Sequence, residues 1–206
     1  MALPPFQPGI RRRVGEVVAA RDLTAISGQV LPVPALSGLV HLQFRRFAGC
    51  PVCDLHLRSF ARRYAEIEAA GVQEVVLFHS SRKALLPYAG ELPFPVVADP
   101  GRRLYAEFGV EAESRALLNP AAWPTILAAV AVSLAGILFA GRPAPPLDAE
   151  GGRLGLPADM LIGADGRILA CKYGDHAGDH WSVDELLARS AVHPARRSSN
   201  CRPMIS

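Results

Sequence analysis

Two cysteines separated by two residues, Cys50 and Cys53, are the side chains of this sequence best suited to chemistry. Thiols at this spacing can cycle between a dithiol and a disulfide, or can supply half of a tetrahedral zinc site. The other two cysteines, Cys171 and Cys201, stand far apart and form no second pair with the spacing usual for zinc ligands. The spacing therefore favours redox chemistry over zinc binding and over inert buried thiols.

The dithiol lies between a short apolar run at residues 39–44 and a stretch from Leu55 to Ala70 whose apolar residues recur at helical spacing. If the helix starts at Pro51, Cys50 sits at its N-terminus, where the helix stabilises negative charge and lowers a thiol pKa. The sequence thus predicts that Cys50 is the nucleophile and that Cys53 is the resolving thiol.

The histidines offer weaker candidates. His56 lies within one helical turn of Cys53 and could assist proton transfer, whereas His79 has no partner that the sequence identifies. His176 and His180 could share a metal on a helix, but the glycines around them indicate a loop. We therefore predict no metal and no other cofactor.

The composition describes a globular protein. The chain has 206 residues, of which 50% are hydrophobic, and a net charge of +3 that comes largely from arginines near its two ends. This charge demands no nucleic-acid partner. A dithiol in a chain with few cysteines suits a reducing compartment, and Met1 to Pro5 show no apolar signal core, so we expect a cytoplasmic protein.

The remaining pattern alternates strands and helices, as in a single α/β domain over residues 15–190. A loose arm precedes it at 1–14, and a disordered tail follows at 191–206. The strand, dithiol, helix, strand order indicates a right-handed parallel crossover. The elements that we expect are a hairpin (17–20 and around 29–30, turning at 27–28), strands at 39–44, 75–78, 93–100, 156–162 and 167–172, and helices at 55–70, 82–92, 102–108 and 182–190.

One segment interrupts this pattern. Trp123 to Ala140 carries no charge over about 18 residues, the lower limit for a membrane-spanning helix. A single crossing would separate two halves of one sheet, so we interpret it as an apolar helix within an insert at about residues 115–152. It would cover a sheet face, form a homodimer interface or rest on a membrane surface.

The order of elements, with the dithiol at the first strand-to-helix junction, resembles the thioredoxin fold, a central mixed sheet flanked by helices. In that fold a cis proline faces the dithiol, and the resemblance places Pro157 there. The outline from Gly15 to Leu187 is also similar to the peroxiredoxin-like branch of the alkyl hydroperoxide reductase and thiol-specific antioxidant (AhpC/TSA) superfamily. The motifs that carry this resemblance are Phe44 to Cys50, including Gly49, then Pro93 to Pro100, Leu156 to Asp159, Asp165-Gly166 and Tyr173 to His176.

The sequence departs from the peroxiredoxin pattern at three positions. A threonine or serine normally precedes the peroxidatic cysteine by three residues and a proline precedes that by four, but Phe47 and Gln43 stand here. The position of the usual late arginine is occupied by Pro157. Arg45 and Arg46 are the candidates to supply a substitute positive charge.

The resemblance implies a thiol-dependent peroxidase or thiol-disulfide oxidoreductase. Peroxides or disulfides would be its substrates, and a thioredoxin-like protein or a small thiol its reductant. The missing hydroxyl favours disulfide exchange, whereas the family outline favours peroxide reduction. A second hypothesis is a binding or sensor module that uses the dithiol as a switch and the apolar insert to dock a partner or a membrane.

Overall fold

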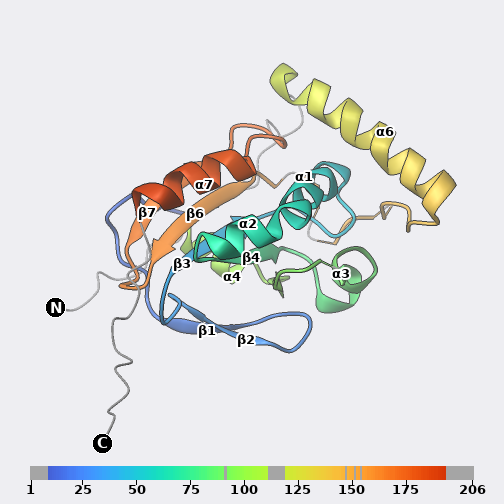
Figure 1. Cartoon of the computed structure of the whole chain (residues 1–206). Coiled ribbons are helices and arrows are strands. Elements are labelled where there is room, and N and C mark those ends of the chain that lie inside the picture. Colours follow the sequence, from blue (N-terminus) through green and yellow to red (C-terminus); the bar gives the residue numbers. More distant parts are fainter. Residues whose placement is uncertain are drawn as a thin grey trace, which may run out of the picture.

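The computed structural model describes residues 9–90, 92–110, 119–146, 148–150, 152–153 and 155–193 (Figure 1). The expected tail from residue 194 onwards, with Cys201, and residues 1–8 of the expected arm lie outside these ranges. Within the arm, the backbone N–H of Arg12 donates to the Tyr173 hydroxyl at 2.6 Å, which attaches this part of the chain to the last strand.

A five-stranded mixed sheet forms the centre of the molecule, in the order β5-β4-β3-β6-β7. The strands β3 and β4 are parallel, as are β4 and β5, whereas β6 is antiparallel to both β3 and β7. This is the thioredoxin-like arrangement that the sequence predicts. The strand bounds are β3 Leu39–Phe44, β4 Val72–Phe78, β5 Val96–Ala98, β6 Ala158–Gly163 and β7 Ile168–Tyr173.

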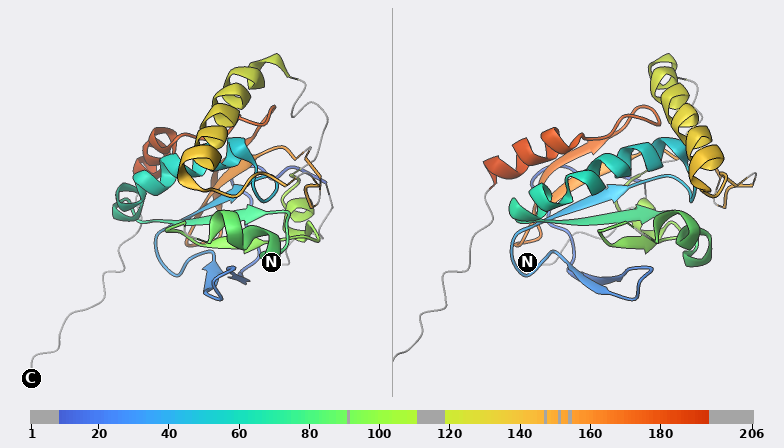
Figure 2. Two further views of the ribbon diagram at one scale, coloured as in Figure 1. Left: turned by 90° about the vertical axis from the view of Figure 1, so that its right-hand side faces the viewer. Right: turned by 45° about the vertical axis from the view of Figure 1, so that its right-hand side comes forward.

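Helices cover one face of the sheet, and a hairpin with one helix covers the other (Figures 1 and 2). Alternate residues of β3 point to opposite faces, so Leu39 packs with the helices and Val40 with the hairpin side. The first face carries α1 Pro51–Arg62, α2 Tyr64–Ala69, α3 Arg82–Ala89 and α7 Val183–Val192; the second carries β1 Arg21–Thr24, β2 Val30–Val33 and α4 Arg103–Glu107.

Several element boundaries differ from those that we predict. The first strand of the hairpin begins at Arg21 rather than Val17, because Val17 instead pairs with Arg167 beside β7. The helix starts at Pro51, as the predicted placement of Cys50 requires, but it does not run unbroken to Ala70, because the backbone of Arg63 leaves helical geometry (φ −114°, ψ 19°). The capping box at Ser182 is present, and it starts α7 as predicted.

Pro157 precedes β6 directly, but the cis bond that the resemblance implies is not there. Among the described residues the cis peptide bond is Val33-Pro34, and the bond between Leu156 and Pro157 is trans. The trans form is the default for an X-Pro bond. The carbonyl of Pro157 accepts a hydrogen bond from the N–H of Gly174 at 2.9 Å, so the residue is tied to the end of β7.

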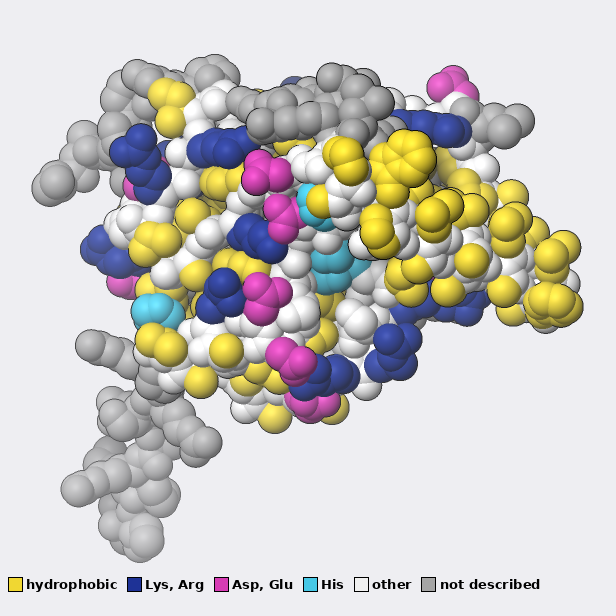
Figure 3. Space-filling view, turned by 90° about the horizontal axis from the view of Figure 1, so that it is seen from above, with side chains coloured by type: hydrophobic (Ala, Val, Ile, Leu, Met, Phe, Trp, Pro, Cys, Tyr) yellow, Lys and Arg dark blue, Asp and Glu magenta, His cyan; other side chains and the backbone are white. Residues whose placement is uncertain are grey.

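The apolar segment forms helix α6, Trp123–Ala140, after a short 3-10 turn η1 at Pro120–Ala122. It packs across α1 rather than over the sheet, which corrects the expectation that it covers a sheet face. Its outer side presents bare hydrophobic side chains (Figure 3), among them Leu138 and Phe139 at 73% and 88% exposure. By length and composition alone residues 120–140 could span a membrane, with a mean hydropathy of 2.0, although one such helix is weak evidence for a crossing. A homodimer through this helix stays a prediction.

Candidate active site

Cys50 is the N-cap residue of α1, and the position follows from the residues around it. Pro51 occupies the first helical position, where its fixed φ suits the helix and its missing N–H leaves no bond unmade. The carbonyl of Cys50 accepts the first helical hydrogen bond, from the N–H of Asp54 at 2.9 Å. The predicted placement of the thiol at a helix N-terminus is therefore confirmed.

The two thiols have opposite electrostatic environments. Burial opposes ionisation of Cys50, but a hydrogen bond from Cys53, the charge of Arg46 and the backbone N–H groups of Val52 and Cys53 lower its pKa to about 6. Burial and the interaction with Cys50 raise the pKa of Cys53 well above its ordinary value. Near neutral pH the pair thus consists of a thiolate at Cys50 and a thiol at Cys53 that donates to it.

Arg46 supplies the positive charge beside the thiolate. Its Nη1 lies 3.7 Å from Cys50 Sγ, and its Nη2 donates to the backbone carbonyl of Arg153. The side chain is only 3% exposed, so solvent screens its interaction with sulfur weakly. We call Arg46, Cys50 and Cys53 the thiolate site.

Phe47 stands where peroxiredoxins carry a hydroxyl residue, and its ring lies beneath two guanidinium groups. The ring centroid is 5.4 Å from Arg46 Cζ and 5.9 Å from Arg153 Cζ. Phe47 therefore helps to hold Arg46 in place by cation–π attraction, but it offers no hydrogen bond to a substrate.

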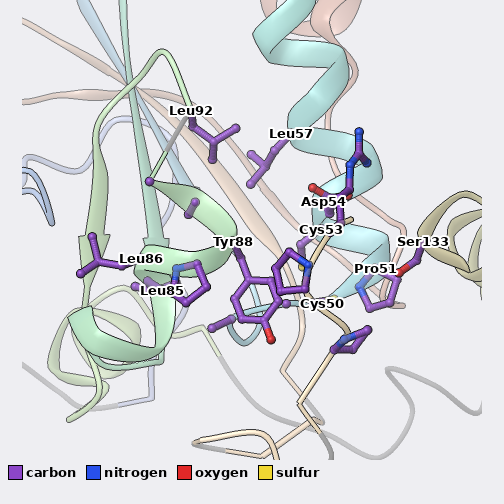
Figure 4. Close-up of a pocket in the computed structure, with 18 of the residues that line it drawn as sticks. Cys50, Pro51, Cys53, Asp54, Leu57, Leu85, Leu86, Tyr88, Leu92 and Ser133 are labelled. Atoms are coloured by element: carbon purple, nitrogen blue, oxygen red, sulfur yellow. The ribbon is translucent and has the colours of Figure 1, made fainter. Parts of the chain in front are cut away.

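Both cysteines line a cavity of about 480 Å³ between α1, α3, α6 and the segment at 141–145 (Figure 4). The cavity walls combine apolar side chains, among them Leu57, Leu85 and the Tyr88 ring, with polar ones such as Asp54 and Arg58. Cys50 itself is only 2% exposed. The thiols are thus open to a small molecule in the cavity but closed to a large one.

Gly49 is required where it stands. It has a φ of +76°, and a Cβ at this position would lie 2.8 Å from both Pro146 Cδ and Tyr88 Cε1. Tyr88 also holds the covering segment, because its hydroxyl donates to the carbonyl of Ala144 at 2.7 Å. The approach of these groups to the backbone beside Cys50 is possible only for glycine.

Arg45 points away from the thiolate site into a second group of buried charges. Its Nη2 lies 2.6 Å from Asp159 Oδ1, 2.5 Å from Gln43 Oε1 and 3.0 Å from His56 Nε2. Of the two arginines suggested by the sequence, the structure thus brings Arg46 to Cys50 and places Arg45 under α1. A neutral His56 accepts from Arg45, and burial together with nearby His180 and Arg45 keeps the His56 pKa well below its ordinary value.

The group around Arg45 is an ionic cluster of strand residues that sequence reasoning missed. His41 Nδ1 lies 2.9 Å from Glu74 Oε1, and Gln43 Nε2 donates to Glu74 Oε2 at 2.5 Å. The ionic cluster consists of His41, Gln43, Arg45, Glu74 and Asp159, each with no exposed surface. Polar residues at alternate positions of β3, on the face that α1 must cover, were the available signal.

The charged residues of the ionic cluster stabilise one another's ionised forms. Burial alone would lower the pKa of His41, but Glu74 and Asp159 raise it to about 9, so the imidazole is a cation at neutral pH. Burial opposes ionisation of Asp159 as well, yet Arg45 and His41 hold its pKa well below the ordinary range. His41 and Arg45 thus lie against the carboxyl groups of Glu74 and Asp159 within the cluster.

Residues 59–176, more than half of the chain, match the family model described as AhpC/TSA antioxidant enzyme. The chain belongs to this family. Its members reduce peroxides or disulfides through thiols, and this chain is a thiol-dependent oxidoreductase of that kind. The match begins after Cys53, so the roles of the two cysteines rest on the geometry above.

The solved structures with a similar fold include peroxiredoxins. Peroxidoxin BcpB from Mycobacterium tuberculosis is 17% identical, with a TM-score of 0.59 over 87% of this chain and 96% of that one. Peroxiredoxin Q from Xanthomonas campestris is 14% identical, with a TM-score of 0.56 over 84% and 91%.

A structure named for disulfide chemistry is also similar. A putative thiol:disulfide interchange protein DsbE from Chlorobium tepidum is 16% identical, with a TM-score of 0.54 over 88% of this chain and 97% of that one. The sequence has no significant match among curated proteins.

Proposed function

We propose that Cys50 attacks the substrate as a thiolate and that Cys53 resolves the product as an intramolecular disulfide. The observation that carries this proposal is the asymmetric pair at the start of α1, with a pKa lowered to about 6 at Cys50 and raised at Cys53. A low pKa creates the nucleophile at neutral pH, and a protonated neighbour remains to complete the reaction.

With a peroxide, the Cys50 sulfur attacks the terminal oxygen and the O–O bond breaks. Sulfur is oxidised to a sulfenic acid, and the alkoxide or hydroxide that leaves takes up one proton. Cys53 then loses its proton and attacks the Cys50 sulfur, which releases water and forms the disulfide. With a disulfide substrate, the same two sulfurs act in turn through a mixed disulfide, and two thiols are released.

A thioredoxin-like protein or a small thiol would reduce the resulting Cys50–Cys53 disulfide and return the enzyme to its starting state. Such a cycle needs a reducing compartment, and this is the basis on which we propose a cytoplasmic location.

The first test is a titration of the Cys50 thiolate by ultraviolet absorbance in Cys53→Ser and in the intact protein. In the intact protein we expect a midpoint near pH 6, and it should stay low in Cys53→Ser, because a hydroxyl donates to the thiolate at least as well as a thiol does. A midpoint at or above about 8.5, the ordinary value for a cysteine, would contradict the proposal.

The second test separates peroxide reduction from disulfide exchange. Stopped-flow measurement should show oxidation of Cys50 by hydrogen peroxide faster than oxidation of a free thiol, and Cys53→Ser should trap the sulfenic acid for detection by mass. Cys50→Ser is the control and should not react. If the rate equals that of a free thiol while exchange with a small disulfide is fast, disulfide reduction is the function.

A further inference from the structure

His79 is a buried histidine whose ring lies near the backbone carbonyl of Glu150 but makes no hydrogen bond of ordinary geometry. It follows β4 directly at the edge of the sheet where the dithiol lies, and it is only 2% exposed. Neither Nδ1 nor Nε2 has a hydrogen-bond partner within the described part of the chain. Buried polar groups are normally paired, so two unpaired nitrogens on one ring indicate a place for a ligand.

The ring lies next to Arg46 of the thiolate site. The N–H of His79 donates to the carbonyl of Arg46 at 3.3 Å, because the chain continues the β3–β4 pairing beyond the strand ends. Gly155 packs between them: a Cβ there would lie 3.1 Å from His79 Nε2 and 3.5 Å from Arg46 Cγ. Arg46 Nε is also buried without a partner. Two side chains with unpaired nitrogens thus stand side by side, one of them in contact with Cys50.

The imidazole is neutral in this position. Burial, followed by the charges of Arg102 and Arg46, lowers the pKa of His79 to about 4, although nearby backbone carbonyl groups act in the opposite direction. A neutral imidazole has one N–H donor and one nitrogen acceptor. Its N–H can therefore donate to an oxygen of a substrate, as a hydroxyl can, whereas Phe47 offers no hydrogen bond at the position where peroxiredoxins have a hydroxyl residue.

We propose that His79 and Arg46 form the oxygen-binding part of the active site, where the imidazole orients the peroxide and hydrogen-bonds the oxygen that leaves. The inference rests on the proposed function, and it assigns to His79 a contact with the substrate.

The roles follow from the reaction. The N–H of His79 donates to the peroxide oxygen that will leave, which turns the terminal oxygen toward Cys50. As sulfur forms its bond to that oxygen and the O–O bond breaks, negative charge grows on the leaving oxygen. The guanidinium of Arg46 and the donor nitrogen of His79 stabilise this charge until a proton from solvent neutralises it.

Two reactions of the same thiolate distinguish this role from a structural one. Hydrogen peroxide has oxygens to be held, whereas iodoacetamide reports only the amount and access of the thiolate. We would measure both rates, and the thermal midpoint, in the wild type and in His79→Phe, which keeps the ring contact with Tyr105 at a centroid distance of 5.7 Å. His79→Leu serves as a second apolar variant, His79→Gln restores a donor and an acceptor, and His176→Leu is the control outside the site.

We expect His79→Phe and His79→Leu to slow the peroxide reaction on the order of 100-fold, the loss typical of one missing oxyanion donor. Alkylation should change less than about twofold, and His79→Gln should recover part of the peroxide rate. The thermal midpoint should stay equal or rise, because an unpaired polar group has been removed. If His79 had only a structural role, its replacement would lower the thermal midpoint.

An equal fall in both rates, or an unchanged peroxide rate, would overturn the inference while leaving the thiolate chemistry of Cys50 in place. A wild-type peroxide rate no higher than that of a free thiol would instead refute peroxide reduction itself, and this inference with it.

Discussion

The ionic cluster and the thiolate site both bury charge near the C-terminal end of β3, but they differ in how completely that charge is paired. Every member of the ionic cluster has at least one hydrogen-bonded partner within it, although His41 Nε2 and Arg45 Nε make no hydrogen bond of their own. Beside the thiolate site, His79 has no side-chain partner in the described residues, and Cys50 carries a charge held by Arg46. Of the two adjacent arginines, Arg45 belongs to the ionic cluster and Arg46 to the thiolate site.

The paired charges of the ionic cluster serve stability, whereas the less completely paired groups at the thiolate site are free to take part in chemistry. A paired buried charge is costly to disturb and has no bond to give to a substrate. An unpaired or half-paired group costs stability in the resting protein, yet it can form new bonds when a ligand arrives. Substitutions should therefore affect the two groups in opposite ways.

The largest expected effect is on folding. Asp159→Asn should lower the free energy of unfolding by about 3–5 kcal/mol, because it leaves Arg45 and His41 without their shared counter-ion. Urea denaturation would measure the loss, and the titration midpoint of Cys50 should hardly move. Asp165→Asn, at a carboxylate with 65% side-chain exposure, is the matched control and should cost less than about 0.5 kcal/mol. A loss below 1 kcal/mol for Asp159→Asn would show that the cluster is not a structural unit.

The next effect is on how stability depends on pH. His41 has a pKa raised to about 9, so its contribution is complete below about 6.5 and is lost as the pH rises through 9. Cys50 has a lowered pKa of about 6, so its contribution is present at high pH and is lost as the pH falls through 6.

Between pH 6.5 and 9 these two contributions oppose each other in the reduced protein. Cys50→Ser removes one of them, and its free energy of unfolding should fall on the order of 3 kcal/mol across this range while that of the wild type changes less. Urea denaturation at several pH values would show this. If the free energy of unfolding varied with pH in the same way in both proteins, His41 and Cys50 would not make opposed contributions.

A smaller effect is expected on the thiolate itself. Arg46→Met should raise the pKa of Cys50 toward its ordinary value and slow alkylation at pH 6 by about tenfold, whereas Arg46→Lys should retain most of the rate because the charge remains. Neither variant should alter the thermal midpoint as much as Asp159→Asn does. Equal alkylation rates for the methionine and lysine variants would show that the charge of Arg46 does not stabilise the thiolate.

The smallest effect should come from a residue outside both groups. Leu138 lies on the outer side of α6 at 73% exposure, and Leu138→Gln should change stability by less than about 0.5 kcal/mol and leave both thiol rates unaltered. Denaturation and alkylation assays would check this. A clear loss of either property would mean that the outer face of α6 already has a partner in solution.

The sequence was most informative where local rules act alone. The helix start at Pro51, the capping box at Ser182 and the uncharged helix from Trp123 to Ala140 depend on neighbours in the chain, and all three are confirmed. The position of the first hairpin strand depended on pairing of Val17 with a distant residue, and it was predicted wrongly.

The site was predictable only in part for the same reason. The lowered pKa of Cys50 follows from Cys53, Arg46 and the backbone N–H groups at the start of α1, which are all close in the chain. The separation of Arg45 from Arg46, and the presence of His79 beside Arg46, depend on which strands pair. Since β3 contacts β4 and β6 from far along the chain, Glu74 and Asp159 could not be assigned to Arg45 without the sheet.

The segment at 141–146 passes over the dithiol and is held there by Tyr88 and by its approach to Gly49. It therefore covers a sulfur that is only 2% exposed. If the proposed cycle holds, a reductant that is itself a folded protein would need this segment to move before it could reach Cys50, whereas an oxidant of a few atoms would not.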